Sequence, residues 1–546
     1  MRLKSARWAM PTFAVLAFSA IFLTVGARAQ SELRPSLTSH VPDAVASGLA
    51  PMVGHLPAQQ RMSLAISLSL RNPDQLEAFL QDLYNPSSPN YRHYLTVAQF
   101  ADRFGATADD YNSVIQFAQA NHLTVRGTGA NRLVVDVEGA VADIEAAFHT
   151  SMGVYQHPTE ARTFYAPERE PLAATNVSLL HISGLDNFVL PVAKNTFGSG
   201  VIAKASGSGP SGSFLGSDLR TAYYGSGSLN GAGQTVALFE YKGYNPTDIN
   251  TYFANAGQAQ NVPILSVSVN GASTSCGSGC GDIEQALDIE QALSMAPGLK
   301  QLRVYVGKND VSIFNQMAAD NVASSISCSF GWAKDQSSLD PIFEEMAAQG
   351  QTVFVATGDQ GSGTAANVTW PSDDAWVTAV GGTVLTTNGG GGSWKSETGW
   401  ANSTGMPSKN NIPIPSYQQL SGVVTSSNGA SSTLRNIPDV SSESAAAQYV
   451  CAIGTCRNQG GGTSYAAPLW ASLIAMANQQ AANRGDANVG YLNPTLYDIT
   501  TGSRFSSDFH DATSGSNGAY SAVKGYDLVT GWGSPIGASL INDLAP

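Results

Sequence analysis

Charged side chains are scarce in this sequence. Only 13% of its 546 residues are Asp, Glu, Lys or Arg, about half of the roughly 25% that is usual in soluble proteins. The formal net charge is −13, and the sequence has no stripe of Lys and Arg that would neutralise a phosphate backbone, which excludes nucleic acid as a partner. A surface with few charges also limits self-repulsion when the medium becomes acidic.

Histidine is scarce in the second part of the chain. Seven of the eight histidines precede residue 190, and the eighth is His510. A serine nucleophile needs a base to take its proton, and histidine is the usual one. A Ser-His-Asp site beyond residue 190 would therefore have to use His510, and a carboxylate base is the alternative.

Cysteine is also rare, with five residues. Cys276 and Cys280, and likewise Cys451 and Cys456, are close pairs in segments rich in Gly, Ser and Thr. Each pair is expected to close a small disulfide ring in an oxidising compartment. Zinc is the rival, but the spacing is loose for it and no histidine lies nearby. Cys328 lies in an apolar strand pattern and is expected to be a buried thiol.

The N-terminus has the features of a secretory signal. Basic residues precede an apolar stretch from Trp8 to Val25, and Ala27-Arg28-Ala29 is a small-x-small cleavage site. We therefore expect residues 1–29 to be removed and the protein to be secreted. An uncleaved anchor is the alternative, because the apolar stretch approaches the length that spans a bilayer. No later segment is apolar enough to span one, so no membrane contact is expected after signal removal.

The rest of the chain changes character twice. Residues 30–190 alternate strand and helix patterns and are expected to form one α+β unit. Residues 191–215 are rich in Gly, Ser and Ala, which predicts an exposed, cleavable linker. Beyond it, helices such as 283–295 and 341–348 separate strand patterns, which lie at 235–240, 301–306, 323–330, 352–356 and 376–380. This alternation predicts an α/β domain whose mostly parallel sheet has helices on both faces.

A possible nucleophile lies in Gly461-Gly462-Thr463-Ser464, which precedes an apolar run with helical spacing. The glycines permit a tight turn, so we expect Ser464 where a turn enters a helix. There its hydroxyl would be exposed, and the N-terminus of the helix would face any oxyanion formed beside it. The alternative is that Thr463 or Ser464 only caps the helix.

Acidic residues provide the rest of a possible site. Glu284 and Asp288 lie at i and i+4 of a predicted helix and share one face. Two carboxyl groups held so close do not both ionise easily, which raises at least one pKa; a solvated acidic face is the alternative. Asp359 follows a buried strand pattern, where parallel sheets present their chemistry. Kept protonated, it would donate to an oxyanion; an Asx-turn is its alternative role.

These motifs, in this order, resemble those of the sedolisin–kumamolisin family of serine-carboxyl peptidases, which are acid peptidases with a subtilisin-like fold. The matching segments are Gly462-Thr463-Ser464 with Pro468, the Glu-x-x-x-Asp helix from Glu284 to Asp288, and the turn Gly358-Asp359-x-Gly361. The segment from Asn85 to Thr96 resembles the activation prosegment of the family. The resemblance covers nearly everything after the signal.

The resemblance implies a role for each acidic residue. Ser464 would be the nucleophile and Glu284 its general base. Asp288 would orient Glu284, and Asp359 would donate to the tetrahedral oxyanion.

It also implies the organisation of the chain. A ferredoxin-like α+β prosegment at 30–190 would inhibit the subtilisin-like α/β peptidase domain at 216–546 of the same chain, and proteins or peptides would be the substrates. Ser329 and Gly331 would pair with the substrate backbone as with an added strand. We expect a monomer.

A structural calcium ion, one per chain, is implied as well. Its ligands would be the carboxylates of Asp511 and Asp527 and the backbone carbonyls of Ala512, Val523 and Gly525, an all-oxygen set that suits Ca²⁺. The family often has glycine at the position of Val523, and a carbonyl ligand survives that change. His510 would then be a loop residue beside a ligand.

The resulting hypothesis is a secreted zymogen of an acid-active peptidase that works through an acyl-enzyme. Two alternatives remain open. One is a secreted binding or surface protein with an inactive peptidase fold. The other is a neutral hydrolase that uses His510 as its base.

Overall fold

The computed structural model describes residues 34–35, 40–197, 206–276, 281–332, 336–362, 369–445 and 447–545. The predicted signal at 1–29 and Cys280 lie outside this part of the chain. Within it, Cys451 and Cys456 form a disulfide, and Cys328 is a buried thiol. Both predictions are confirmed, and the disulfide contradicts zinc binding by that pair. A search of the described helices finds none with the length and apolarity needed to cross a membrane.

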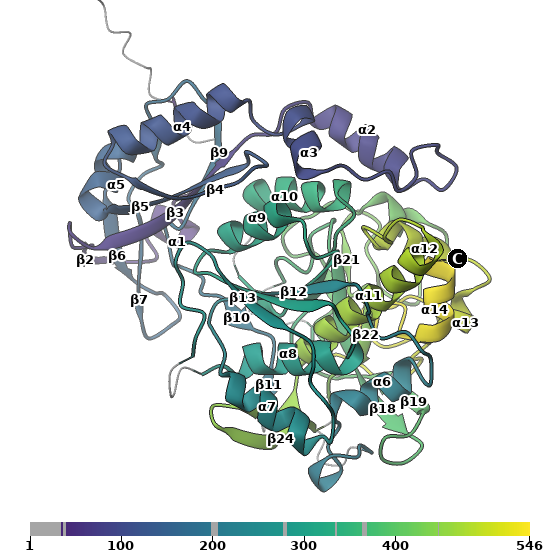
Figure 1. The fold of residues 1–546 in the computed structure, drawn as a ribbon. Helices are drawn as coiled ribbons and strands as arrows, with labels where there is room; N and C mark the ends of the chain where they lie inside the picture. The colour runs from purple at the N-terminus through teal and green to yellow at the C-terminus, as the bar shows by residue number, and fades with distance from the viewer. Residues whose placement is uncertain are drawn as a thin grey trace, which may run out of the picture.

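The N-terminal part forms an α+β unit with its own core. Its main sheet is antiparallel, in the order β4 (Thr124–Thr128), β5 (Val134–Ala140), β3 (Arg61–Leu68), β9 (Leu179–Ser183). The helices α4 (Ala108–Ala120) and α5 (Val141–Phe148) cover it (Figure 1). Alternation in β3 places Leu64 and Ile66 in the apolar core of this unit. A smaller antiparallel sheet consists of β2 (Met52–His55), β6 (Met152–Gln156) and β7 (Thr163–Pro167).

The rest of the chain is an α/β domain around an eight-stranded sheet. The strands follow the order β13 (Ile264–Ser268), β14 (Gln301–Val306), β12 (Thr235–Glu240), β15 (Ser325–Cys328), β17 (Thr352–Ala356), β18 (Thr378–Thr387), β19 (Trp394–Gly399), with β22 (Val440–Glu443) also paired to β18. All pairs are parallel except β18 with β19. Strand β17 is buried at every position, as expected for a parallel strand covered on both faces.

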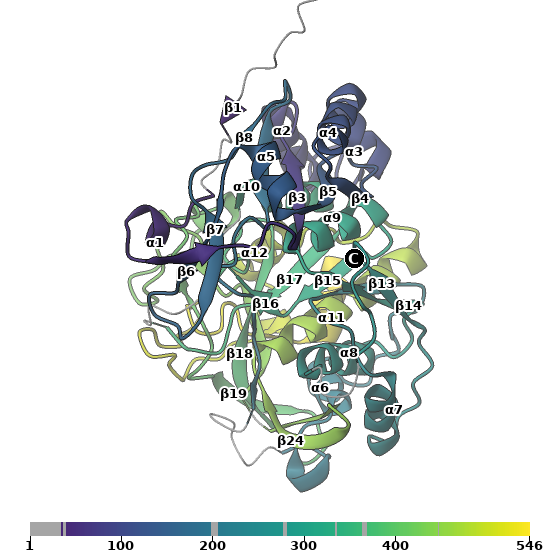
Figure 2. The same ribbon diagram turned by 90° about the vertical axis from the view of Figure 1, so that its left-hand side faces the viewer.

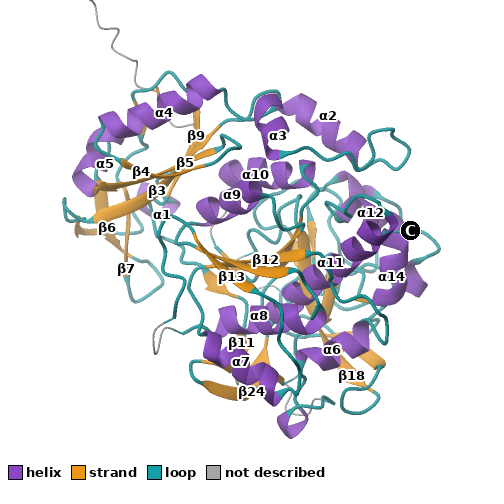
Figure 3. Ribbon diagram, in the orientation of Figure 1, coloured by secondary structure: helices purple, strands orange, loops and turns teal. Residues whose placement is uncertain are grey.

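Helices cover both faces of this sheet, as the sequence predicted. Figure 3 shows the orange strands between α9 (Asp310–Asp320) and α10 (Gln336–Ala348) on one side and α7 (Pro246–Asn255) and α8 (Ile283–Met295) on the other. The long helix α11 (Ala466–Arg484) lies on the same side as α8. The fold is therefore the predicted α/β domain with a mostly parallel sheet.

The N-terminal unit lies over the face that carries α9 and α10, and the perpendicular view in Figure 2 shows the same arrangement. The helices α2 (Pro73–Leu83) and α3 (Val97–Arg103) bring it close to α10. The Tyr84 hydroxyl donates to the carbonyl oxygen of Ala347 at 2.7 Å, and the Asn131 amide donates to the carboxyl of Glu345 at 2.7 Å. Polar contacts between buried groups thus join the two units.

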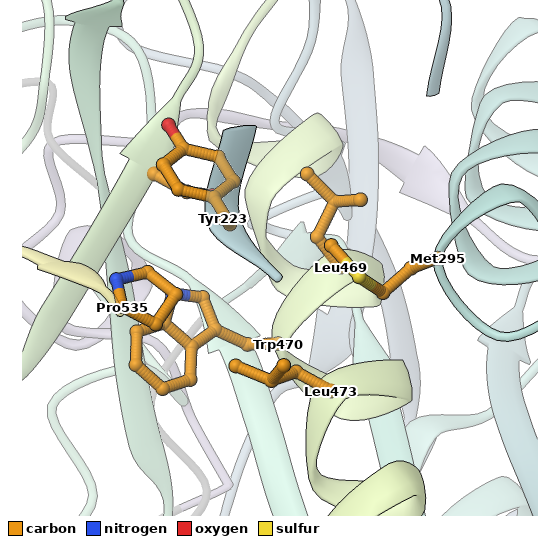
Figure 4. Close-up of a pocket in the computed structure, with 7 residues that line it drawn as sticks. Tyr223, Met295, Leu469, Trp470, Leu473 and Pro535 are labelled. Atoms are coloured by element: carbon orange, nitrogen blue, oxygen red, sulfur yellow. The ribbon is translucent and has the colours of Figure 1, made fainter. Parts of the chain in front are cut away.

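Helices α8 and α11 pack tightly against each other. Figure 4 shows Met295 of α8 beside Leu469, Trp470 and Leu473 of α11, with Tyr223 of α6 (Gly216–Tyr223) across the same gap. The gap has no room for a water molecule. Close-packed interiors of this kind resist small relative shifts, so the two helices hold their side chains at a fixed separation.

The predicted strand at 323–330 is divided in the structure. It consists of β15 and a separate short strand, β16 (Phe330–Gly331), which pairs with β10 (Val192–Ala193) instead of the main sheet. Ser329 separates them, because its hydroxyl donates to Asp288 at 2.9 Å while its carbonyl oxygen accepts from Lys194 N at 2.9 Å. The chain therefore leaves the sheet at Ser329.

A buried ion pair ties the sheet to the C-terminal helices. Arg435 Nη2 lies 2.5 Å from Asp439 Oδ2, and neither side chain is exposed. The Tyr497 hydroxyl of α12 (Asn493–Thr501) and the backbone N–H of Ala379 in β18 donate to the same carboxylate at 2.6 and 2.7 Å. Asp439 therefore connects three segments that are distant in sequence.

Replacing Asp439 by Asn is expected to lower the free energy of unfolding by about 3–5 kcal/mol, because it leaves the Arg435 charge buried without its partner. Urea unfolding of the full chain measures this. Asp498→Asn, on the exposed side of α12, is the matched control and should change the value by less than about 0.5 kcal/mol. Equal, small effects of both variants would contradict the assignment.

Candidate active site

Ser464 lies where a turn enters helix α11. Gly462 precedes it with a φ of 130°, which only glycine adopts readily. A short 3-10 turn, Thr463–Tyr465, then leads into α11 at Ala466. The sequence predicted an exposed hydroxyl, and that detail is wrong: Ser464 is fully buried. Its backbone N–H donates to the carbonyl oxygen of Lys194 at 3.0 Å, so the linker covers it.

Glu284 and Asp288 lie on the buried side of α8, which has no solvated face around them. Glu284 is 4% exposed and Asp288 is not exposed at all, so the interpretation as a solvated acidic face is wrong. Burial raises the pKa of Glu284 to about 8, while hydrogen bonding with Ser464 and Asn195 opposes the rise. The Glu284 carboxyl thus lies at the serine hydroxyl.

Burial also raises the pKa of Asp288 well above its usual range, and the charges of Glu240 and Glu284 raise it further. Oδ1 of Asp288 accepts from the hydroxyl of Ser329 at 2.9 Å. Asp288 thus lies close enough to the carboxyl group of Glu284 and to a third carboxyl group for their charges to interact.

That third carboxyl group belongs to Glu240, which is not among the site residues predicted from the sequence. Glu240 ends strand β12, is fully buried, and hydrogen bonds with Asp288. Gln285 donates to its Oε2 at 2.8 Å. The signal was present, since the apolar run Val236 to Phe239 ends in an acid at the carboxyl end of a parallel strand, as with Asp359. We call Glu284, Asp288 and Glu240 the carboxyl cluster.

Asp359 approaches the serine from the end of β17. Its Oδ1 accepts from the backbone N–H of Thr463 at 2.8 Å and from the Thr463 hydroxyl at 3.0 Å. These bonds reach across more than a hundred residues, so the Asx-turn interpretation is wrong. Burial raises the pKa of Asp359 to about 7, and the bonds from Thr463 and the charge of Lys194 oppose the rise. Its Oδ2 has no hydrogen-bond partner among the described residues.

The start of the predicted linker passes directly through this site. Strand β10 pairs antiparallel with β16, and β11 (Thr196–Phe197) pairs antiparallel with β24 (Thr455–Gly461). Lys194, between them, is 7% exposed. The prediction of an exposed linker is therefore wrong over 192–197, because two strand edges bind this segment as an added strand.

Ser329 and Gly331 are the residues that hold this added strand. The carbonyl oxygen of Ser329 accepts from Lys194 N at 2.9 Å, and Gly331 is the register partner of Val192. Both residues therefore contact an extended backbone at the serine.

The residues expected to bind calcium come together near the C-terminus. Asp511 Oδ2 accepts from Gly525 N at 3.0 Å, and Asp527 Oδ2 accepts from Val523 N at 3.0 Å. Ala512 is the buried neighbour of Asp511. Burial raises the pKa of Asp527 to about 7. Two carboxylates that close on one loop form an oxygen-rich set that fits a hard cation.

His510 lies in this loop and not at the serine. Its ring stacks on Trp394, with the centroids 3.8 Å apart, and burial lowers its pKa to about 4. The Ser464 hydroxyl instead donates to the carbonyl oxygen of Ser329 at 3.5 Å and interacts with the carboxyl of Glu284.

Comparison with known proteins agrees with this geometry. Residues 50–188 match the family described as "Pro-kumamolisin, activation domain". Kumamolisin of Bacillus sp. (strain MN-32) is 31% identical over 95% of this chain and 97% of its own. Sedolisin of Pseudomonas sp. (strain 101) is 28% identical over 90% of this chain and 88% of its own. The solved structure of Pseudomonas sedolisin with pseudo-iodotyrostatin has a TM-score of 0.52 at 28% identity, over 62% of this chain and 98% of that one.

The fold, the site and these similarities define a serine-type peptidase that carries an N-terminal activation domain. The chain belongs to the sedolisin–kumamolisin family of serine-carboxyl peptidases. The resemblance carried by its sequence motifs is thereby confirmed.

The buried carboxyl groups predict how stability depends on pH. Folding raises the pKa of Asp359 to about 7 and that of Glu284 to about 8, whereas unfolded carboxyls titrate near pH 4. The folded state thus retains protons that the unfolded state loses, so the free energy of unfolding is greatest in acid and falls as the pH rises toward these values. The Tm of a Ser464→Ala chain should therefore decrease between about pH 5 and pH 8.

Adding Glu284→Gln to the Ser464→Ala chain should remove part of this decrease of Tm with pH. Adding Glu77→Gln, on the exposed side of α2, should leave the decrease unchanged. A Tm that rises over this range in the Ser464→Ala chain would contradict the assignment.

Proposed function

We propose that this protein is the secreted zymogen of an acid-active peptidase whose general base is Glu284. The observation that carries the proposal is the interaction of the Glu284 carboxyl with the side chain of Ser464, in a site without histidine among its described side chains. Residues 1–29 would direct secretion, 30–190 would inhibit the enzyme, 191–215 would be cut, and 216–546 would form the peptidase.

In the proposed reaction Ser464 Oγ attacks the carbonyl carbon of a peptide and its proton passes to Glu284. Asp288 orients Glu284, and the carboxyl cluster shares the proton through its hydrogen bonds. The oxyanion accepts from the backbone N–H of Ser464 and from protonated Asp359. Collapse gives an acyl-enzyme, which water hydrolyses. Ser329 and Gly331 hold the substrate backbone.

The same roles predict activity in acid. Asp359 donates to the oxyanion only while protonated, and burial raises its pKa to about 7. When the pH rises past that value, an ionised Asp359 repels the developing negative charge. Glu284 accepts the proton only while it is ionised, and because the carboxyls of the cluster interact, they titrate as a group and not as single residues.

Glu284→Gln is expected to lower kcat/KM for peptide hydrolysis at about pH 4 by a factor of about 10²–10⁴, the usual contribution of a general base. His510→Ala should leave it unchanged, because that side chain stacks on Trp394 away from the serine. Rates of a fluorogenic peptide across the pH range measure both.

Loss of peptide hydrolysis in His510→Ala, together with unchanged hydrolysis in Glu284→Gln, would establish the Ser-His-Asp alternative. A wild-type chain that hydrolyses no peptide at any pH would instead establish an inactive, peptidase-fold binding protein.

We also propose that one structural Ca²⁺ binds between Asp511 and Asp527. The carbonyl groups of Ala512, Val523 and Gly525 would complete the ligands. The support is that two carboxylates from separate segments converge on one loop. A bound cation would neutralise them and fix the loop.

Calcium removal is therefore expected to destabilise the protein. Chelation of the full chain should lower its Tm, consistent with a loss of about 2.7 kcal/mol for a site at a hundredfold excess of ligand over Kd. Asp527→Asn should lower the Tm and abolish the effect of chelator. Asp498→Asn should have the wild-type Tm and the wild-type response to chelator. A Tm that responds to chelator equally in Asp527→Asn and wild type would contradict the site.

A further inference from the structure

We propose that Lys194–Asn195 is the first bond that the enzyme cuts in its own chain, and that the pocket around Lys194 selects a lysine on the acyl side of the bonds it cuts in other peptides. This inference rests on the proposed function and adds to it a scissile bond and a substrate class.

The backbone register places one peptide bond at the serine. Strand β10 pairs antiparallel with β16 and ends at Ala193, and β11 begins at Thr196 and pairs with the end of β24. Only Lys194 and Asn195 lie between the two strands. The chain is therefore held on both sides of a single bond, as a substrate must be.

The carbonyl group of Lys194 lies where an oxyanion would form. Its oxygen accepts from the backbone N–H of Ser464 at 3.0 Å. A Cβ added at Gly462 would meet this oxygen at 2.5 Å and Asp359 Oδ2 at 2.7 Å, so both oxygens border the same point. Protonated Asp359 and the Ser464 N–H therefore flank the carbonyl oxygen of Lys194, which is the geometry that stabilises a tetrahedral intermediate.

Asn195, whose backbone nitrogen would be the leaving group, is also held in position. Asn195 Nδ2 donates to Oε2 of Glu284, whose carboxyl hydrogen bonds with Ser464 as well. The proposed base is thus in contact with both the attacking residue and the residue that departs.

The side chain of Lys194 fills a pocket whose walls are glycines. A Cβ at Gly331 would meet both Cε and Nζ of Lys194 at 2.6 Å and the carbonyl oxygen of Trp370 at 3.1 Å. A Cβ at Gly358 would meet Nζ at 3.3 Å and the hydroxyl oxygen of Thr404 at 3.1 Å. The absence of side chains at both positions leaves space for a long, narrow group with a polar end.

The charges around the pocket favour a cation. Burial lowers the pKa of Lys194 to about 8, while Asp359, Asp373 and Glu284 oppose the decrease. Asp373 is fully buried, and its carboxyl accepts from the hydroxyls of Ser408 and Thr369 at 2.7 and 3.1 Å. The ammonium group of Lys194 therefore stays protonated in an acidic medium. The charge of Asp373, whose carboxyl is held in place by neutral donors, favours it.

The cut proceeds by the same acyl-transfer steps as the proposed peptidase reaction. Ser464 Oγ bonds to the carbonyl carbon of Lys194, the bond from that carbon to Asn195 N breaks, and the hydroxyl proton passes through Glu284 to the departing amine. Water then hydrolyses the ester and leaves Lys194 with a new carboxyl group and Ser464 with its hydroxyl. The downstream part of the chain would then begin with a free N-terminus at Asn195, directly before strand β11.

The first test follows the full-length chain in acid. N-terminal sequencing and intact mass over time should show Asn195 as the first new N-terminus. Lys194→Glu should abolish or relocate that cut, and Lys204→Glu, the same change in the same linker, should not. A first cut at another bond in the wild-type chain, or an unaltered cut in Lys194→Glu, would overturn the proposal.

The second test uses the acid-activated enzyme and peptides with the sequence Pro-Val-Ala-Lys-Asn-Thr-Phe. Lysine should be preferred over norleucine, which has the same shape without the charge, by about tenfold in kcat/KM. Asp373→Asn should reduce that ratio. Equal rates for the two peptides would overturn the selectivity.

Two different outcomes separate this inference from the proposed function. Cleavage that needs Ser464 but shows no preference for lysine contradicts this inference and leaves the proposed function standing. Absence of any cleavage that needs Ser464 contradicts the proposed function itself.

Discussion

Burial of carboxyl groups beside a serine is the constraint on which the rest of this structure depends. Moving an ionised carboxylate out of water is costly unless it is paired, hydrogen bonded or neutralised by a proton. Each carboxyl of the cluster accepts one hydrogen bond from a neutral donor, and burial favours its protonated form; the donors are Asn195 for Glu284, Ser329 for Asp288 and Gln285 for Glu240. The cost makes protonated carboxyls favourable in the folded state, and so links the stability of the fold and its chemistry to acid.

The architecture supplies what this arrangement requires. Strand β12 delivers Glu240, α8 delivers two acids one turn apart, and the turn before α11 delivers the serine. The dry contact between the C-terminal end of α8 and the first turns of α11 limits movement of the two helices relative to each other (Figure 4). The start of the predicted linker adds an extended segment that binds two strand edges and covers the serine. One set of contacts thus positions the acids and closes the site.

Local pattern was enough to predict much of this from the sequence. The i and i+4 spacing of Glu284 and Asp288, the strand before Asp359 and the glycines before Ser464 each depend on nearby residues, and the structure brings all of these side chains together. The helix Ile283–Met295 has the predicted bounds. Pairing over long distances was not predictable. Nothing near Lys194 indicates that strand edges more than a hundred residues away bind it, so a composition typical of linkers suggested an exposed segment.

The central claim is that an acid, and not an imidazole, activates the serine. The rate at which Ser464 adds to a peptide aldehyde in acid measures this step without later hydrolysis, because the hemiacetal requires the same base and oxyanion site. The account predicts that Glu284→Gln slows this addition by a factor of about 10²–10⁴, whereas His510→Ala has no effect. Addition to Glu284→Gln at the wild-type rate would contradict it.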